Sequence, residues 1–155
     1  MTRPTAKRQS RARDVYVFRE SAFYWFGHLE DHFNRRLLRA MRPERLTVGR
    51  WRCLAVLAEV DDLALGELAV HTVIDKPALT HVIDQMEADG LVERRINDGD
   101  RRVIKVNLTE DGHALFGRML PKAREVYARA LDDVRTSDYK LMLTVLKRMA
   151  ANLKD

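Results

Sequence analysis

The chain has 155 residues, of which 46% are hydrophobic, and this content is sufficient for the core of one moderate domain. A single cysteine excludes an intrachain disulfide framework, and no apolar run approaches the roughly 18 residues of a membrane span. The formal net charge is +5, but five of the 28 basic residues lie within the first 13 positions, which leaves 23 basic against 23 acidic residues elsewhere. Bulk charge therefore does not indicate a nucleic-acid partner, and we expect a soluble, cytoplasmic protein without membrane contacts.

The N-terminal part of the chain is predicted to be a tail followed by a long helix. Residues 1–13, MTRPTAKRQSRAR, lack apolar periodicity and acidic residues, so they predict a disordered basic tail. This tail is equally compatible with salt-dependent phosphate contacts and with a passive, solubilising role. The helix is expected from Asp14 to about Met41. Its apolar residues recur at helical spacing: Val15, Phe18, Ala22, Trp25, Phe26, Leu29, Phe33 and Leu37.

Two helices separated by a short turn are predicted in the middle of the chain. Residues 65–71, LGELAVH, predict the first, with Leu65, Leu68 and Ala69 facing one way. A turn over residues 72–75 follows, and a second helix is expected from Lys76 to Asp89. This order is that of a helix-turn-helix, in which the second helix reads DNA.

The second of these helices has clear boundaries and one apolar face. Asp75 is a good N-cap, Pro77 is tolerated in the first turn, and Gly90 is expected to end the helix in the left-handed conformation. The apolar residues follow the spacing i, i+3, i+4, i+7: Leu79, Val82, Ile83 and Met86. The opposite face carries small or polar side chains, namely Pro77, Ala78, Thr80, His81, Asp84 and Gln85. Such a face suits either base edges and phosphates or plain solvent.

A cationic ribbon is predicted directly after this helix. Leu91 and Val92, and then residues 103–108, VIKVNL, favour strands. Between them, RRINDGDRR contains an Asn-Asp-Gly turn signal bracketed by two arginine pairs. Asp100 is well placed to hold Arg102 through charge-assisted hydrogen bonds. An arginine at the tip of a ribbon suits a narrow minor groove, whereas a solvated charged turn is the alternative for this segment alone.

The C-terminal part predicts two more helices. Thr109 is expected to cap a helix that runs to about Asp132, with a kink at Pro121. Thr136 or Ser137 starts the last helix, whose apolar side carries Leu141, Val145, Met149 and Leu153. Because the terminal helices have more apolar surface than one small monomer needs, we expect an intertwined homodimer rather than a monomer.

Several of these stretches together resemble a MarR-type transcriptional regulator, from about Val15 to Leu153. The matching stretches are Leu46-Thr47, Trp51 with Leu54-Ala-Val-Leu57, Gly66-Glu-Leu-Ala69, Leu79-Thr-His-Val-Ile-Asp-Gln-Met-Glu87, Gly90-Leu-Val-Glu-Arg94, Asp100-Arg-Arg102 and Leu108-Thr-Glu-Asp-Gly112. The resemblance implies a mainly α fold with a small β-wing. Residues 46–112 would form a winged helix-turn-helix, and residues 14–45 and 113–155 the dimerisation helices. His81 and Pro77 depart from the family's usual residues, so the base preference is open.

The resemblance also implies a double-stranded DNA partner. The residues expected at or near the major groove are Lys76, Pro77, Ala78, Thr80, His81 and Gln85. Arg101 and Arg102, supported by Asp100, would enter or flank the minor groove. Arg94 and Arg95 would lie mainly on phosphates. The protein is then expected to be a homodimeric repressor that binds a pseudo-palindromic operator.

In regulators of this type a small aromatic or anionic effector binds between the dimerisation helices and the winged domain. The residues expected to contact it are Tyr24, Trp25, His28, His32, Trp51 and Arg52, which supply stacking surface and cationic donors. An aromatic acid or its thioester fits this set. Plain core packing is an equally good interpretation of the aromatic residues.

Other function classes have less support in the sequence. There is no phosphate-binding glycine loop, no H-E-x-x-H pattern and no recognisable nucleophile setting, so we expect neither an enzyme nor a cofactor. His28 and His32 are one turn apart but lack evident further ligands, so no metal site is expected. Cys53 is predicted to be a buried, inert thiol. The remaining alternatives are a ligand-sensing or protein-interaction dimer that does not bind DNA, and a metal- or redox-responsive regulator.

Overall fold

The computed structural model describes residues 17–96, 99 and 103–154. Predictions for the basic tail, for residues 14–16, for the turn residues Asn97 and Asp98, and for Asp100, Arg101 and Arg102 lie outside the described residues. The elements are short 3-10 turns at Phe18–Glu20 and Arg42–Glu44, helices α2 (Ala22–Met41), α3 (Val48–Glu59), α4 (Leu65–Thr72), α5 (Lys76–Ala88), α6 (Glu110–Ala130) and α7 (Thr136–Asn152), and strands β1 (Leu63–Ala64), β2 (Val92–Ile96) and β3 (Ile104–Leu108).

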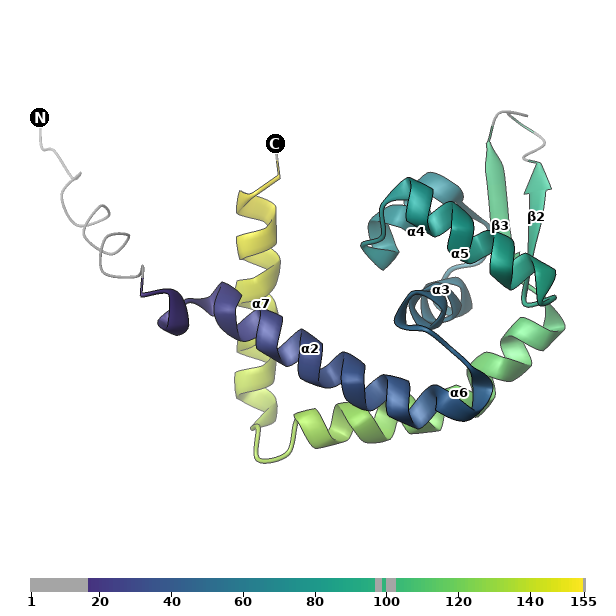
Figure 1. Ribbon diagram of the computed structural model, residues 1–155. Coiled ribbons are helices and arrows are strands. Elements are labelled where there is room, and N and C mark those ends of the chain that lie inside the picture. Colours follow the sequence, from purple (N-terminus) through teal and green to yellow (C-terminus); the bar gives the residue numbers. More distant parts are fainter. Residues whose placement is uncertain (1–16, 97–98, 100–102, 155) are drawn as a thin grey trace, which may run out of the picture.

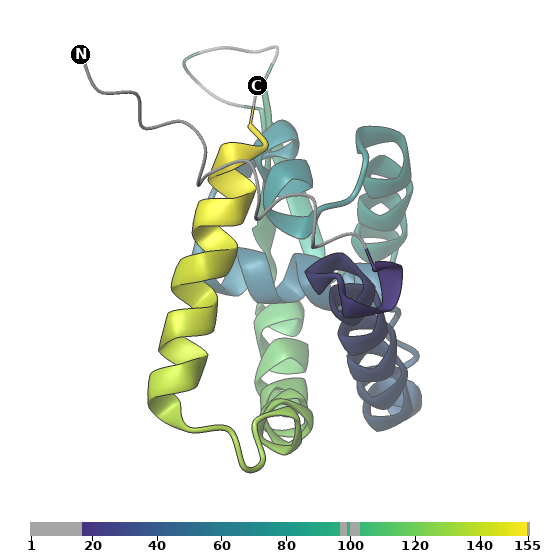
Figure 2. The ribbon, with the colours of Figure 1, turned by 90° about the vertical axis from the view of Figure 1, so that its left-hand side faces the viewer.

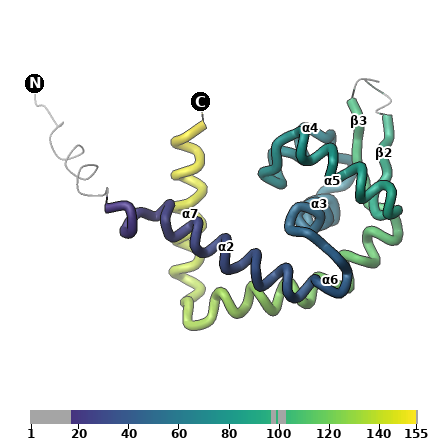
Figure 3. Tube along the Cα trace, viewed as in Figure 1, coloured from purple at the N-terminus to yellow at the C-terminus, as the bar shows by residue number. Residues whose placement is uncertain are grey.

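The molecule has two parts, which are seen together in Figure 1. Helices α3, α4 and α5 pack with the sheet in one part, and α2 and α6 run side by side in the other. The continuous trace in Figure 3 enters through α2, passes through the α3–β3 part and returns along α6. The mainly helical fold with a small antiparallel ribbon is therefore confirmed. Among the residues that the structure describes, no helix is long and apolar enough to cross a membrane.

The first long helix begins later than the sequence predicted. Residues 18–20 form a 3-10 turn, and Ser21 has an extended backbone with its side chain accepting a hydrogen bond from the Phe23 amide at 3.2 Å. Serine is a preferred N-cap because its hydroxyl oxygen satisfies a free amide at the start of the helix. The predicted continuous helix is therefore wrong for residues 17–21, and α2 starts at Ala22.

The sheet has one more strand than the predicted ribbon. Strands β2 and β3 pair antiparallel, with Val92 opposite Leu108 and Arg95 opposite Lys105. The two-residue strand β1 adds to the other edge of β3, giving the order β1-β3-β2. Two residues are too few to show strand alternation in a sequence, so β1 could not be recognised there.

The two parts meet where α6 leaves the sheet. Thr109 caps α6 by accepting a hydrogen bond from the Gly112 amide at 3.1 Å, and its hydroxyl donates to the Gly90 carbonyl at 2.6 Å. Gly112 packs directly against the backbone of Leu91, and a Cβ at Gly112 would be 2.1 Å from the Leu91 carbonyl oxygen. The start of α6 is therefore fixed directly against the end of the predicted reading helix. Pro121 lies inside α6, which continues to Ala130.

Helix α7 stands apart from the rest of the molecule. It crosses α2 in the view of Figure 1 but is separated from most of it in Figure 2. Within its described range, Thr136–Asn152, none of its residues is buried, and Leu141 and Val145 are 64% and 46% exposed. Its Tyr139 ring meets Tyr127 of α6 edge to face, with a hydrogen bond between the hydroxyls. An apolar helix side of this kind is therefore left open within the single chain.

Candidate nucleic-acid interface

Helix α5 forms as the sequence predicted. Its N-cap Asp75 accepts a hydrogen bond from the Ala78 amide at 2.9 Å, which satisfies one free donor of the first turn. Leu79, Ile83 and Met86 are fully buried against α3, α4 and the sheet. Burying this stripe fixes the rotation of the helix about its axis, so its other side faces solvent.

The exposed side of α5 carries the residues predicted for the major groove. All of them are exposed, and they lie on one helix: Lys76, Pro77, Ala78, Thr80, His81 and Gln85. Gly90, with a φ of 72°, ends the turn that follows the helix in the left-handed region, where glycine is favoured. The chain then enters β2 at Val92, so the ribbon follows directly after α5.

Arg94 has an internal role that the sequence did not reveal. From β2 its guanidinium contacts Asp84 Oδ1 and Glu87 Oε2 of α5, each at 2.5 Å, and its side chain is 22% exposed. Partial burial opposes the charge of Arg94, but its hydrogen bonds to Asp84 and Glu87 outweigh that effect and raise its pKa above the ordinary arginine value. Arg94 therefore fixes the ribbon to α5. Its guanidinium, which was predicted to contact phosphates, is bound to these two carboxylates instead.

A second arginine holds the same, C-terminal end of α5. Arg50 of α3 contacts Asp89 Oδ2, just after α5, at 2.5 Å, and its side chain is only 13% exposed. No local pattern in the sequence indicates this pair, because 39 positions separate the two residues. Together with Arg94, it fixes the position of the C-terminal end of α5 relative to α3 and the ribbon.

In the described part of the ribbon, Arg95 makes no contact with the carboxylates of α5 that hold Arg94. Arg95 pairs with its neighbour Glu93 and is exposed. On β3, Lys105 Nζ donates to the backbone carbonyl of Asp62 at 2.7 Å and to its Oδ2 at 3.1 Å. The hydrogen bond from Lys105 is the main reason that the pKa of Asp62 is lowered. Arg95 is therefore the predicted phosphate contact that stays accessible in the described part of the wing.

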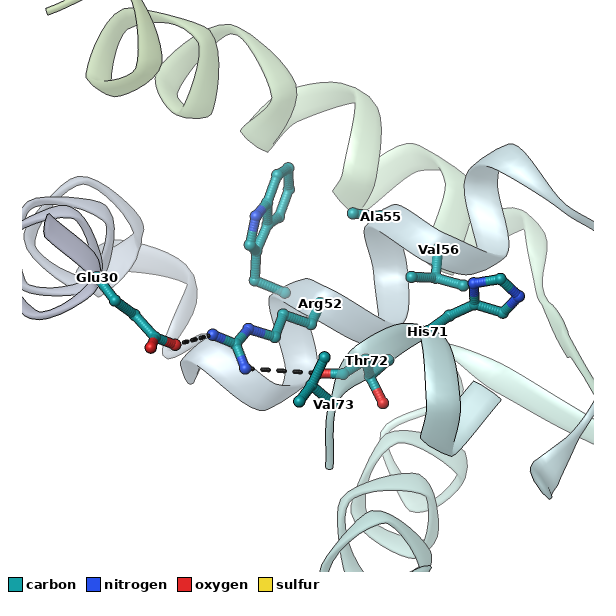
Figure 4. A pocket seen from close by; sticks show the side chains of 8 residues that line it. Glu30, Arg52, Ala55, Val56, His71, Thr72 and Val73 are labelled. Carbon is teal, nitrogen blue, oxygen red and sulfur yellow. Dashed lines mark hydrogen bonds and ion pairs between the residues drawn. The ribbon is translucent and has the colours of Figure 1, made fainter. Parts of the chain in front are cut away.

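A cavity of about 470 Å³ lies between α2, α3 and α4 (Figure 4). Arg52 crosses its floor: one guanidinium nitrogen donates to Glu30 Oε1 of α2 at 2.6 Å, and the other donates to the Thr72 carbonyl of α4 at 3.4 Å. Trp51 adds an aromatic wall and stacks on Phe116 of α6, with the rings 5.6 Å apart. One arginine thus joins a helix of the terminal part to the helix-turn-helix.

The predicted effector residues fall into two groups. Trp51 and Arg52 line the cavity, whereas the other four form a ladder of neighbouring rings along α2: Tyr24, Trp25, His28 and His32. None of these four is among the cavity's lining residues, so the described structure does not bring all of the predicted residues into one site. Glu30 was not predicted to lie in this site, although its carboxylate is the charged partner of Arg52 there. The sequence does not indicate this pair because the two residues come from different helices, α2 and α3.

Cys53 is buried, as the sequence predicted. It lies within the core on α3, and burial raises the pKa of its thiol to about 12. The thiol is therefore protonated near neutral pH, and protonated thiols are poor nucleophiles. Within residues 17–96, 99 and 103–154, no group of three or more His, Cys, Asp and Glu side chains could hold a metal ion.

These features agree with comparisons to known proteins. The sequence model of the MarR family matches residues 46–104, which span α3 to the start of β3. The homoprotocatechuate degradative operon repressor of Escherichia coli is 33% identical over 106 residues, covering 68% of this chain and 71% of that protein. The chain belongs to the MarR family. The transcriptional repressor IacR of Pseudomonas putida is 26% identical over 143 residues, or 92% of this chain and 86% of that protein.

Solved structures of the MarR family share the fold. A MarR-family regulator from Silicibacter pomeroyi has a TM-score of 0.79 at 29% identity, covering 87% of this chain and 91% of its own. A mutant of Escherichia coli MarR in complex with operator DNA has a TM-score of 0.75 at 20% identity, covering 86% of this chain and 97% of its own. The chain is a DNA-binding transcriptional regulator. The family's members are regulators rather than enzymes.

Proposed function

We propose that the protein is a homodimeric repressor that binds a pseudo-palindromic operator and is released by a small anionic aromatic effector. The observation that carries this proposal is the apolar side of α7, which stays exposed in the described chain together with Phe23, Trp25 and Leu29 of α2. A C₂ dimer would cover that side and would present two α5 helices to one duplex. Light scattering at several concentrations, with and without DNA, tests the assembly.

An apolar groove beside α7 supports the proposal that a second copy of the chain packs against this helix. An apolar groove of about 580 Å³ lies between α2, α6 and α7, and its walls are Phe26, Leu29, Glu30, Phe33, Tyr127, Ala130, Leu131, Val134, Tyr139 and Met142. Residues 14–45 and 113–155 would then serve dimerisation, and residues 46–112 would bind DNA. The tail at residues 1–13 would lie outside both.

The DNA contacts follow from the exposed side of α5 and from the wing. We place at or near the major groove the exposed residues of α5, with Lys76 at its edge: Lys76, Pro77, Ala78, Thr80, His81 and Gln85. Arg101 and Arg102, with Asp100, are assigned to the minor groove on the sequence alone. Arg95 would contact phosphates, while Arg94 would act indirectly by holding the ribbon against α5.

Arg95 gives a prediction about this interface. Replacing Arg95 with alanine should weaken binding to all duplexes by a similar factor, because phosphate contacts carry no sequence information. The slope of log affinity against log salt should become shallower by about 1, since one fewer counterion is released. A titration of a specific and a random duplex over a range of salt concentrations measures both. Loss of preference between the two duplexes would show instead that Arg95 reads bases.

Arg52 is the proposed effector anchor. An effector carboxylate could take the place of Glu30 on the guanidinium, and so separate α2 from α4. Two relatives support an aromatic acid by their names: the repressor of the homoprotocatechuate operon, and Bordetella bronchiseptica BpsR, whose DNA binding is regulated by 6-hydroxynicotinic acid. The ligand would act by binding better to a dimer whose α5 spacing no longer fits the operator.

Two opposite substitutions test the Arg52 site. Arg52→Gln should weaken binding of homoprotocatechuate or 6-hydroxynicotinic acid by about tenfold or more, because a charge-assisted hydrogen bond is lost. Glu30→Gln should strengthen it, because the internal competitor loses its charge. Thermal shift with each acid gives the readout, since a ligand of the folded state raises the melting temperature. If Arg52→Gln leaves the shift of a responsive acid unchanged, the ligand does not bind through Arg52.

A further inference from the structure

From Pro77 to Ala88, all of which the structure describes, α5 carries no arginine or lysine with which to read guanine. The commonest specific contact to guanine uses the N–H donors of arginine or lysine. Between Pro77 and Gln85 the charged residue on the exposed side of α5 is Asp84, which is paired with Arg94. Lys76 precedes this stretch, but its side chain lies over α4: a Cβ on Gly66 would be 3.8 Å from Lys76 Cε and 3.9 Å from Nζ. The chemistry of α5 therefore favours other bases.

Gln85 and His81 form a hydrogen-bonded pair on this exposed side. They are one turn apart, and the amide nitrogen of Gln85 lies 2.9 Å from Nε2 of His81. An amide nitrogen can only donate, so the imidazole nitrogen accepts. The second amide N–H of Gln85 and its carbonyl oxygen remain available for a partner outside the protein.

These two free groups are the ones that bind adenine. In the major groove adenine presents an acceptor, N7, beside a donor, the N6 amino group, and a glutamine side chain matches both at once. The bond to His81 also limits the orientations of the Gln85 side chain before DNA arrives. Less rotamer freedom is then lost on binding, which favours this contact over less ordered ones.

Three residues in the first two turns of α5 present no free side-chain donor, namely Pro77, Ala78 and Thr80. The Thr80 hydroxyl donates to the Lys76 carbonyl at 2.8 Å, so this donor is used within the helix. Its methyl group, together with exposed Pro77 and Ala78, leaves apolar surface on the same side as His81 and Gln85. Such surface matches the C5-methyl group of thymine, which is the apolar feature of the major groove.

We infer that Gln85, oriented by His81, reads the adenine of an A·T pair in each half-site, while Thr80, Pro77 and Ala78 lie against a thymine methyl group. This inference rests on the proposed function, because it requires α5 to enter the major groove. His81 is a positioning residue, and Gln85 is the residue that contacts the base.

Selection of bound duplexes from a random pool, with the full chain, tests the assignment. The wild type should enrich A·T at one symmetric position of each half-site. Gln85→Ala should lose the preference at that position and keep it elsewhere. Gln85→Glu should shift the preference there to C·G, because a carboxylate accepts a hydrogen bond from the cytosine amino group. All of these residues are exposed, so the variants should fold.

Binding to a duplex with a modified base measures the strength of the contact between Gln85 and adenine. Replacing the chosen adenine with 7-deazaadenine should weaken wild-type binding by about fivefold to 100-fold and leave Gln85→Ala unaffected. His81→Ala should show a smaller penalty than the wild type, and an unchanged penalty would overturn the orienting role of His81. If a site is enriched but Gln85→Ala alters no position, the reading role of Gln85 is wrong while DNA binding stands. If no sequence is enriched at all, the proposed function fails with it.

Discussion

Replacing Gly112 with alanine is expected to destabilise the fold by about 3 kcal/mol, the upper part of the usual range for an overpacked site. The new Cβ would lie 2.1 Å from the Leu91 carbonyl oxygen and 3.2 Å from a Leu108 methyl group. Both neighbours are held in place, because the Leu91 carbonyl accepts a hydrogen bond from the Thr109 amide at 3.1 Å and Leu108 is in the sheet. The start of α6 would have to move away from the end of α5.

Gly117 on the same helix is the matched control. A Cβ there would meet nothing within 4 Å, so Gly117→Ala should stabilise α6 by up to about 1 kcal/mol through helix propensity. Urea unfolding at one fixed protein concentration measures both variants, since the stability of a dimer depends on concentration. A Gly112→Ala variant as stable as Gly117→Ala would contradict the close contact between α6 and the α5–β2 turn.

Replacing both Leu141 and Val145 with glutamate is expected to leave a folded monomer with weak operator binding. These side chains are 64% and 46% exposed in the single chain, so their loss should cost the monomer's own fold little. Charges on this side would oppose its burial against a second copy. Without dimerisation the two half-sites are no longer bound together, and operator affinity should fall by about 100-fold or more.

Lys140 and Lys147 provide the control on the same helix. At 100° per residue they project about 100° to 160° away from Leu141 and Val145 around α7, and both are exposed. Changing both to glutamate adds the same residues but should leave the dimer intact. Sedimentation velocity for assembly, and titration of a two-half-site duplex for binding, give the two readouts. A dimeric Leu141/Val145 variant would show that another surface joins the subunits.

The sequence predicted α5 and the ribbon well because their signals are local. The cap at Asp75, the stripe ending at Met86 and the turn at Gly90 are set by neighbouring residues, and the structure has them at those positions. Local hydrogen bonding and apolar spacing are sufficient to fix such an element.

The ion pairs of Arg94 and Arg50 with the end of α5, and the cavity at Arg52, could not be predicted, because their residues meet only after folding. Arg94 finds Asp84 and Glu87 across the α5–β2 turn, and a pattern of alternating charges does not distinguish this pairing from a solvated surface. Likewise Glu30 and Arg52 come from different helices, so their pairing could not be predicted. The effector residues predicted on this part of α2 were His28 and His32, whereas the residue that lines the cavity is Glu30. The predicted start of α2 was too early, because Val15 and Phe18 continue the apolar spacing on the N-terminal side of Ser21.

The measurement that tests the central claim most directly is a titration of the full chain with a selected duplex and with a scrambled duplex of equal composition. Native mass spectrometry of the same mixtures would count the chains on each duplex. We predict two chains on the selected duplex, half-sites centred about one helical turn apart, and an affinity at least about 1000-fold above that for the scrambled one at physiological salt. Equal affinity for the two duplexes, or a single chain on a saturated selected duplex, would contradict a dimeric, sequence-specific regulator.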